Sequence, residues 1–183
     1  MMMIAVTVTG KDRPGIIAEL TGAIFKSKGN LEDASMTILE GEFAMILLAD
    51  LKTKSAAAVL RERLDQIRRQ YHLSIAVRPI LRRVKRGEKH LRGTEPWVAS
   101  VLGKDRAGIV FRVCQVLASS GLNITDLNSK IMGHGRKATY ALVLEVDVPR
   151  KPALTDCVKR RFQTLEKQLR VKITFHLLGT AYL

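Results

Sequence analysis

A six-residue segment occurs twice in this chain and sets the plan of the whole sequence. Gly10-Lys11-Asp12-Arg13-Pro14-Gly15 returns as Gly103-Lys104-Asp105-Arg106-Ala107-Gly108, so residue 103 lies 93 positions after residue 10. Each copy follows a β-branched, apolar run and precedes a segment with the apolar spacing of a helix. In a chain of 183 residues, this duplication predicts two similar domains of fewer than about 100 residues each. Domains this small bury little surface, so each should gain stability by packing against another.

Strand and helix signals follow the same order in both copies. Pro14 favours the start of the first helix with Asp12 as a candidate cap, and Gly29-Asn30 favours its end. The expected strands are 3–9, 30–39, 42–51, 73–81, 97–102, 123–132, 137–148 and 171–178; the expected helices are 14–28, 54–70, 107–120 and 152–169. The order β-α-β-β-α-β predicts an α+β fold of two ferredoxin-like units, each with an antiparallel sheet and both helices on one face. An exposed sheet edge favours side-by-side pairing of the units into an extended antiparallel sheet.

The predicted domains are residues 1–81 and 96–183, joined by a basic linker at 82–95. The stretch from Leu81 to Gly93 carries six basic residues and one acid. One interpretation is a solvated linker that self-repulsion keeps extended. The other is an arm, Arg82 to Arg92, that contacts phosphates or an acidic protein without reading sequence.

Charge is the outlier of the composition: 31 Lys and Arg against 17 Asp and Glu give a formal charge of +14. A basic balance favours anionic partners, although solubility and compositional bias explain it equally well. Aromatic residues make up 5% of the chain, and no recognition-helix motif is present. The sequence therefore argues against sequence-specific DNA reading and leaves non-specific contact with nucleic acid open.

Catalytic and metal chemistry find no support in the motifs. The four histidines lie far apart, and the two cysteines lack metal-ligand or disulfide spacing. Cys114 falls on the apolar face of its predicted helix with Val110 and Leu117, which indicates a buried structural thiol. The repeated turn lacks both the GxGxxG and the Walker patterns. We therefore expect no enzymatic activity, catalytic residue, metal or cofactor.

Two further patterns concern the start of the chain and one loop. Residues 1–6 have no basic n-region, and no apolar stretch approaches the roughly 18 residues that span a bilayer. We therefore expect a cytoplasmic protein without membrane contact. Gly133-His134-Gly135 predicts a hairpin turn between the middle strands of the second copy.

The repeated turn itself predicts a binding site. Free N–H groups at a helix N-terminus, at the positive end of its dipole, can receive a carboxylate. Gly15 and Gly108 allow the backbone to approach a ligand closely. Acceptors for an ammonium group are available in the side chains of Asp12, Asp105, Asn30 and Asn123. The alternative is that these residues only cap helices and shape turns, with Arg13 solvated.

These residues resemble a known family. The pattern Gly10 to Ile17 followed by Gly29 to Asp33, and its second copy in Gly103 to Val110 and Asn123 to Asp126, is similar to the amino-acid-binding ACT domain. Two tandem copies without a catalytic domain resemble the glycine cleavage system transcriptional repressor group. The resemblance implies effector binding at domain interfaces, lined by Asp12, Arg13, Pro14, Gly15, Ile16 and Asn30 in the first copy and by Asp105, Arg106, Ala107, Gly108, Ile109 and Asn123 in the second.

The expected function is therefore regulatory rather than catalytic. The resemblance implies a homo-oligomer that senses an amino acid or small carboxylate and signals to a regulatory protein partner, with a role in transcriptional control of amino-acid metabolism. One position departs from the family pattern: Ala107 stands where the family often has proline. Alanine leaves this turn less rigid and retains an N–H, so the second site is expected to bind differently or not at all. The alternative function is a basic interaction module that acts through the arm between the domains.

Overall fold

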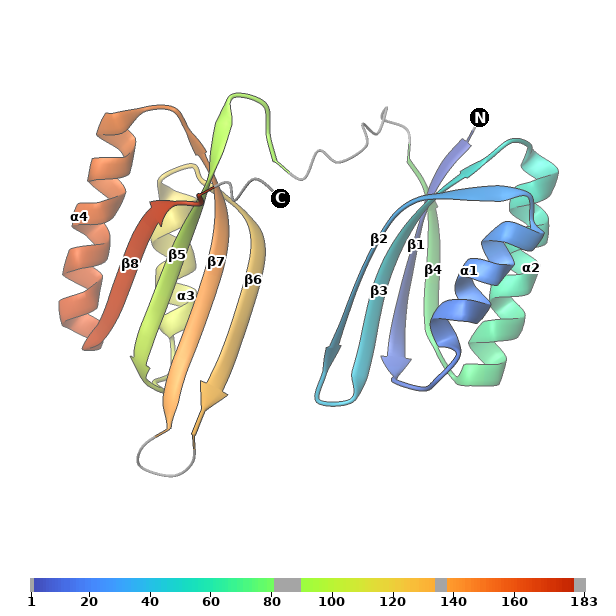
Figure 1. The fold of residues 1–183 in the computed structure, drawn as a ribbon, viewed down its shortest axis with the longest axis horizontal. Helices are drawn as coiled ribbons and strands as arrows, with labels where there is room; N and C mark the ends of the chain where they lie inside the picture. Colours follow the sequence, from blue (N-terminus) through green and yellow to red (C-terminus); the bar gives the residue numbers. More distant parts are fainter. Residues whose placement is uncertain (1, 81–89, 134–137, 180–183) are drawn as a thin grey trace. The chain divides into compact units, whose positions relative to one another are not determined.

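Both copies of the repeated segment run from the last two residues of the first strand to the start of the first helix of a β-α-β-β-α-β unit (Figure 1). The computed structural model describes residues 2–80, 90–133 and 138–179. The chain divides into two units, Met1–Gly87 and Glu88–Leu183.

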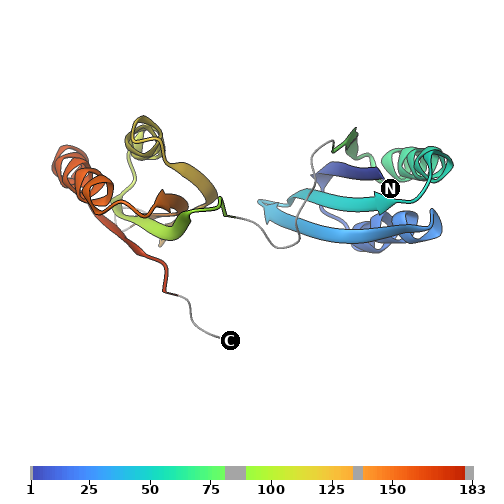
Figure 2. The same ribbon diagram turned by 90° about the horizontal axis from the view of Figure 1, so that it is seen from above.

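The first unit is a four-stranded antiparallel sheet with two helices on one face (Figures 1 and 2). Its sheet has the order β2-β3-β1-β4. The bounds are β1 (Met2–Lys11), α1 (Ile16–Lys26), β2 (Gly29–Leu39), β3 (Glu42–Leu51), α2 (Lys54–Tyr71) and β4 (Ser74–Pro79). Glu40 and Gly41, with φ of 50° and 81°, form the tight turn between β2 and β3 that the sequence predicts.

The second unit repeats this arrangement with the sheet order β6-β7-β5-β8. Its elements are β5 (Thr94–Lys104), α3 (Ile109–Ser119), β6 (Asn123–Met132), β7 (Thr139–Pro149), α4 (Pro152–Leu169) and β8 (Val171–Leu177). The predicted α+β class and the two ferredoxin-like units are confirmed. Pairing of the units into one extended sheet stays a prediction, as do the domain limits at 81 and 96.

Alternation along the strands and helical spacing along the helices build each core. In β3, the side chains of Phe43, Met45 and Leu47 are buried on the face that the helices cover. In α2, Leu60 and Leu64 lie one turn apart and pack into the same cluster. Full burial of such a side chain contributes about 1.5–3 kcal/mol, so the sheet-to-helix layer holds each unit together.

The first helix of each unit begins later than predicted. Gly15 and Gly108 occupy the N-cap position with φ of 93° and 89°. This left-handed conformation is not that of a right-handed helix, so the helix can begin only at the next residue. Helix α1 therefore begins at Ile16 rather than at Pro14. The predicted cap was wrong as well, since α1 has no side-chain cap hydrogen bond and Asp12 lies outside its first turn.

The basic segment between the copies lies mostly outside the described residues, because 81–89 are not described. Its described end is attached to the second unit: His90 Nδ1 lies 2.7 Å from Asp147 Oδ1, and the Leu91 N–H donates to Asp147 Oδ2 at 2.9 Å. Leu91 is nevertheless 59% exposed, so both interpretations of the segment, solvated linker and phosphate-contacting arm, stay predictions. The predicted turn at Gly133-His134-Gly135 also falls largely on residues 134–137, outside the described part of the chain.

Candidate functional site

The first copy of the repeated turn connects the end of β1 to the start of α1 and is tied to a neighbouring hairpin. The Asp12 N–H donates to the Gly41 carbonyl at 2.9 Å, which fixes the turn against the β2–β3 connection. Gly15 is left-handed at φ 93°, and a Cβ there would lie 3.4 Å from the Tyr71 hydroxyl. The turn therefore has one backbone conformation that favours glycine and leaves little room beside it.

A cavity of about 540 Å³ opens beside this turn. Its lining residues are Asp12, Arg13, Pro14, Gly15, Ile16, Ile17, Ala18, Met36, Ile38 and Phe43. The predicted site residues Asp12 to Ile16 all lie on it. Phe43 is 1% exposed and pairs with Ile38 across the β2–β3 ladder, so the hairpin contributes an apolar wall opposite the polar turn.

The polar side of the cavity is an uncapped helix N-terminus. The Ile16 N–H reaches the Arg13 carbonyl only at 3.5 Å, and the N–H groups of Ile17 and Ala18 have no acceptor among the described residues. These groups lie at the positive end of the α1 dipole, where a carboxylate is stabilised. Arg13 adds a cation and Asp12 adds an anion to the same lining. Adjacent positive and negative groups with an apolar wall suit a zwitterion that carries an apolar side chain.

The predicted site residue Asn30 is at the other end of the same unit. It pairs with Asp50 of β3, and Asp50 pairs with Met3 near the start of β1, whereas the turn follows Lys11 at the end of β1. At about 3.3 Å per residue, this places Asn30 roughly 25 Å from the turn. Its amide donates to Glu32 Oε1 at 2.6 Å. Asn30 can therefore meet a ligand at such a turn only if the turn belongs to another domain.

The second turn repeats the backbone of the first. Gly108 is the left-handed N-cap of α3, with no side-chain cap, and its carbonyl accepts the Arg112 N–H at 3.0 Å. Asp105, Arg106 and Ala107 are all exposed before it. The segment between β6 and β7 includes residues 134–137, outside the described ranges. Asn123 pairs with Asp147 and so lies at the far end of its own sheet, as Asn30 does.

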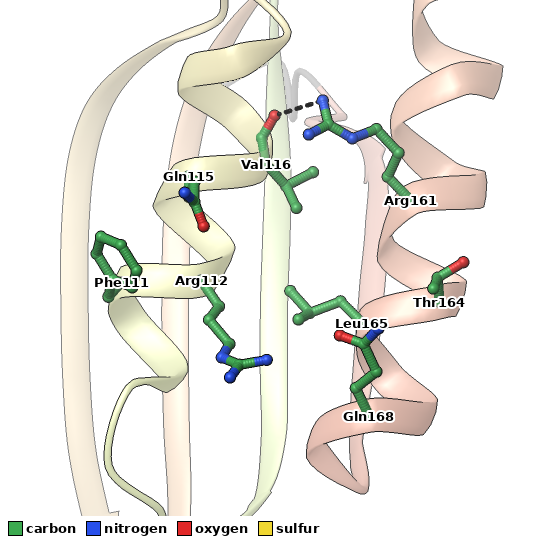
Figure 3. A pocket seen from close by; sticks show the side chains of 8 residues that line it. All are labelled: Phe111, Arg112, Gln115, Val116, Arg161, Thr164, Leu165 and Gln168. Carbon is green, nitrogen blue, oxygen red and sulfur yellow. Dashed lines mark hydrogen bonds between the residues drawn. The ribbon is translucent and has the colours of Figure 1, made fainter.

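A second cavity, of about 400 Å³, lies between α3 and α4 in the second unit (Figure 3). Its lining residues are Phe111, Arg112, Gln115, Val116, Arg161, Thr164, Leu165 and Gln168. Arg161 is already engaged: it donates to the Val116 carbonyl at 3.2 Å, to Ser120 Oγ at 2.8 Å and to Ser119 Oγ at 2.7 Å. This guanidinium joins the two helices, which gives it a structural role.

Sequence reasoning missed the hairpin wall of the turn cavity and the buried aspartates. Met36 and Ile38 belong to a strand whose middle and end are exposed, and only the β2–β3 register places them beside the turn. Asp50 and Asp147 occupy the same position in the two sheets, at 9% and 2% exposure. An aspartate within an apolar strand is the signal that could have identified them.

Comparison with known proteins identifies both units. Residues 2–78 match the ACT domain, and residues 97–162 match it a second time. The chain belongs to the ACT domain family. UPF0237 proteins of Methanopyrus kandleri and Methanocaldococcus jannaschii are 36% and 32% identical to it over 78 residues, which is 42% of this chain and 87% of each relative.

Solved structures extend the likeness to both ACT domains. An unknown protein from Galdieria sulphuraria is 26% identical, with a TM-score of 0.79 over 97% of this chain and 99% of that one. A putative glycine cleavage system transcriptional repressor is 17% identical, with a TM-score of 0.69 over 98% of both chains. At 17% identity, this second comparison shows a shared fold only. The tandem ACT architecture is thereby shown along nearly the whole chain.

Other chemistry has little to build on in the described part of the two ACT domains. Residues 2–80, 90–133 and 138–179 contain no group of three or more His, Cys, Asp or Glu that could hold a metal ion. Cys114 is partly buried, and burial raises the pKa of its thiol, whereas Cys157 is exposed. Among the described helices, none combines the length and the apolar content that crossing a membrane requires.

Proposed function

We propose that this protein is a regulatory ligand sensor whose first ACT domain binds a free amino acid, or a similar small carboxylate, in the cavity beside Asp12 to Ile16. The observation that carries the proposal is the uncapped N-terminus of α1. Its Ile17 and Ala18 N–H groups face no acceptor among the described residues, and both residues line the cavity. Both family matches are to a regulatory domain, which supports sensing rather than catalysis.

Each part of an amino acid has a matching group at this turn. The α-carboxylate accepts hydrogen bonds from the free N–H groups at the positive end of the helix dipole, and Arg13 lies beside it. The ammonium group donates hydrogen bonds to the Asp12 carboxylate, which lies on the same lining. The ligand's side chain lies against Ile38 and Phe43, so an apolar or small side chain is favoured over a charged one.

Asn30 completes such a site only from a neighbouring domain, because in its own unit it lies at the opposite end of the sheet. We therefore place the effector between the turn of one ACT domain and the second strand of another, in the same chain or in a second copy. Binding that bridges two domains favours one arrangement of them. A regulatory partner that reads this arrangement, such as a component of transcriptional control, would receive the signal by linkage.

The test combines a thermal-shift screen of the twenty amino acids with calorimetric titration of those that stabilise the protein. Replacing Arg13→Glu puts a negative charge beside the bound carboxylate, and we expect the Kd to rise at least about tenfold. Arg106→Glu makes the same change at the second turn and is the matched control for the first site. The amide and N-acetyl derivatives of the ligand should each bind more weakly, because each removes one charged group.

Two results would contradict the proposal. The first is the absence of stabilisation by any of the twenty amino acids. The second is a ligand whose affinity is unchanged by Arg13→Glu, since that ligand would bind away from the first turn, and a loss of affinity in Arg106→Glu would then place it at the second turn.

A further inference from the structure

A third cavity lies at the opposite end of α1 from the turn, in the first unit. Its volume is about 430 Å³, and it is formed where α1 ends and where β3 passes into α2. Lys26, Ser27 and Lys28 line it from the end of α1, and Lys52, Thr53 and Ser55 line it from the start of α2. An 11-residue helix is about 16 Å long, so this cavity is separate from the amino-acid site.

The charged part of this lining is cationic, and Ala56 and Val59 add an apolar side. Lys26, Lys28 and Lys52 are exposed, and none has an ion-pair partner among the described residues. No acidic residue lines the cavity. Three ammonium groups around one space repel each other unless an anion joins them, so the cavity favours an anion of more than one charge.

The start of α2 points further donors at the same place. Thr53 caps this 18-residue helix by accepting the Ala56 N–H at 3.1 Å. The N–H groups of Lys54 and Ser55 have no acceptor in the described part of the chain. The positive end of the helix dipole adds to the lysine charges, as at many anion sites.

Ser27, which lines this cavity, provides an independent observation in favour of a ligand. It is 3% exposed, and its Oγ is buried without a hydrogen-bond partner. In the second unit, Ser120 at the same helix end donates to the Val116 carbonyl at 2.8 Å and accepts from Arg161. Arg63, at the position of Arg161 along its helix, likewise has a buried Nε without a partner. Buried polar groups are normally hydrogen-bonded, so an acceptor between α1 and α2 is expected.

The end of the first helix carries more positive charge in the first unit than in the second. Lys26 and Lys28 stand where the second unit has Ser119 and Gly121. Lys28 has a left-handed φ of 56°, a conformation that Gly121 adopts without strain at 71°. The first unit therefore keeps a lysine where the backbone favours glycine, and the second unit has neither the charge nor the strain.

We propose that this cavity binds the phosphate group of a small phosphorylated molecule. A phosphate monoester carries close to two negative charges and three acceptor oxygens. The lysines match this charge. The Ser55 N–H and the Ser55 hydroxyl, whose oxygen also lies 2.9 Å from Thr53 Oγ1, donate to the phosphate oxygens. A nucleic-acid backbone fits less well, because the donors gather around one cavity instead of following a line.

The test measures phosphate binding by the full-length protein. Isothermal titration with inorganic phosphate and with phenyl phosphate, at constant ionic strength set with chloride, should show binding by the wild type. The double variant Lys28→Gly/Lys52→Ala should weaken it about tenfold or more. Lys28→Gly installs the residue of the second unit, so the fold is kept, and circular dichroism checks this. Lys151→Ala, at the start of α4, is the matched control and should bind like the wild type.

The possible outcomes separate this site from the amino-acid site. Arg13→Glu should leave phosphate binding unchanged, so each proposal can fail alone. Equal affinity in the wild type and the double variant would overturn the site. Binding of duplex DNA without measurable binding of phosphate or phenyl phosphate would overturn the assignment to a small molecule.

Discussion

At the scale of single residues, the same position in the two sheets has two different environments. Asp147 is buried and receives hydrogen bonds from His90 and from the Leu91 N–H. Asp50, its counterpart in β3, has a buried Oδ1 without a partner among the described residues. The difference arises because the segment before β5 folds back onto its own sheet. Duplicated sequences can therefore share a buried acid without sharing the interaction that stabilises it.

The two cysteines should differ in reactivity. Burial raises the pKa of the Cys114 thiol, whereas Cys157 is exposed, and the thiolate is the form that reacts. We expect iodoacetamide at pH 8 to modify Cys157 well before Cys114, as followed by peptide mass spectrometry. In concentrated urea the two rates should become similar. Faster modification of Cys114 in the folded protein would contradict the assignment.

The raised pKa of Cys114 also makes the stability of the folded state depend on pH. Because the folded state holds the Cys114 proton more tightly than the unfolded chain does, the contribution of this thiol is complete below its ordinary pKa. It declines as the pH rises above that value, since the unfolded chain ionises first. Replacing Cys114→Ala should therefore reduce the fall in stability at alkaline pH.

At the scale of elements, α2 and α4 are both 18 residues long but begin differently. Thr53 caps α2 through its side chain, whereas Lys151 at the start of α4 makes no side-chain cap and is followed by a proline. Threonine satisfies one of the free N–H groups of the first turn, and lysine cannot accept. Helix α4 therefore depends more on packing of its apolar face, which includes Val158 and Phe162.

Removing the cap of α2 should destabilise the first unit, and adding a cap to α4 should stabilise the second. Thr53→Ala should lower the free energy of unfolding of the first unit by about 1 kcal/mol. Lys151→Ser should raise that of the second unit by about 0.5–1 kcal/mol, because it adds an acceptor at an uncapped helix. Urea unfolding followed by circular dichroism measures both. An unchanged midpoint for Thr53→Ala would show that the cap contributes little.

At the scale of the whole molecule, each unit builds a core from its own residues. The buried residues of the first core cluster fall between Ile4 and Leu73, and those of the second fall between Ala99 and Phe175. Two such cores make independent folding of the units the natural expectation. His90 and Leu91 hydrogen-bond to Asp147 of the second unit. The predicted limit at residue 96 stays a prediction, which fragments can test.

Fragments test where the second unit begins. A fragment of residues 88–183 keeps both hydrogen bonds to Asp147, while one of residues 96–183 lacks them together with Thr94 and Glu95, the first residues of β5. Loss of partners for a buried polar group costs about 1–3 kcal/mol, so the shorter fragment should be less stable by at least this amount. Chemical denaturation of both fragments gives the difference. Equal stability would support the limit at residue 96.

The sequence by itself determined the duplication, the order of elements and the position of the repeated turn. Periodicity and the Gly41 turn place helices and strands to within a few residues, because these signals are local. Resemblance of Asp12 to Ile16 to the ACT domain identified the residues that line one cavity. Side-chain type alone could not show that Gly15 ends the turn in a left-handed conformation, which moved the helix start.

Only the tertiary structure decided which distant residues share a site. The β2–β3 register brings Ile38 and Phe43 to the turn and carries Asn30 to the other end of the sheet. The packing of α1 against α2 gathers Lys26 and Lys52 around the phosphate cavity. These relations depend on strand pairing and helix packing between segments far apart in the chain, and no local pattern encodes them.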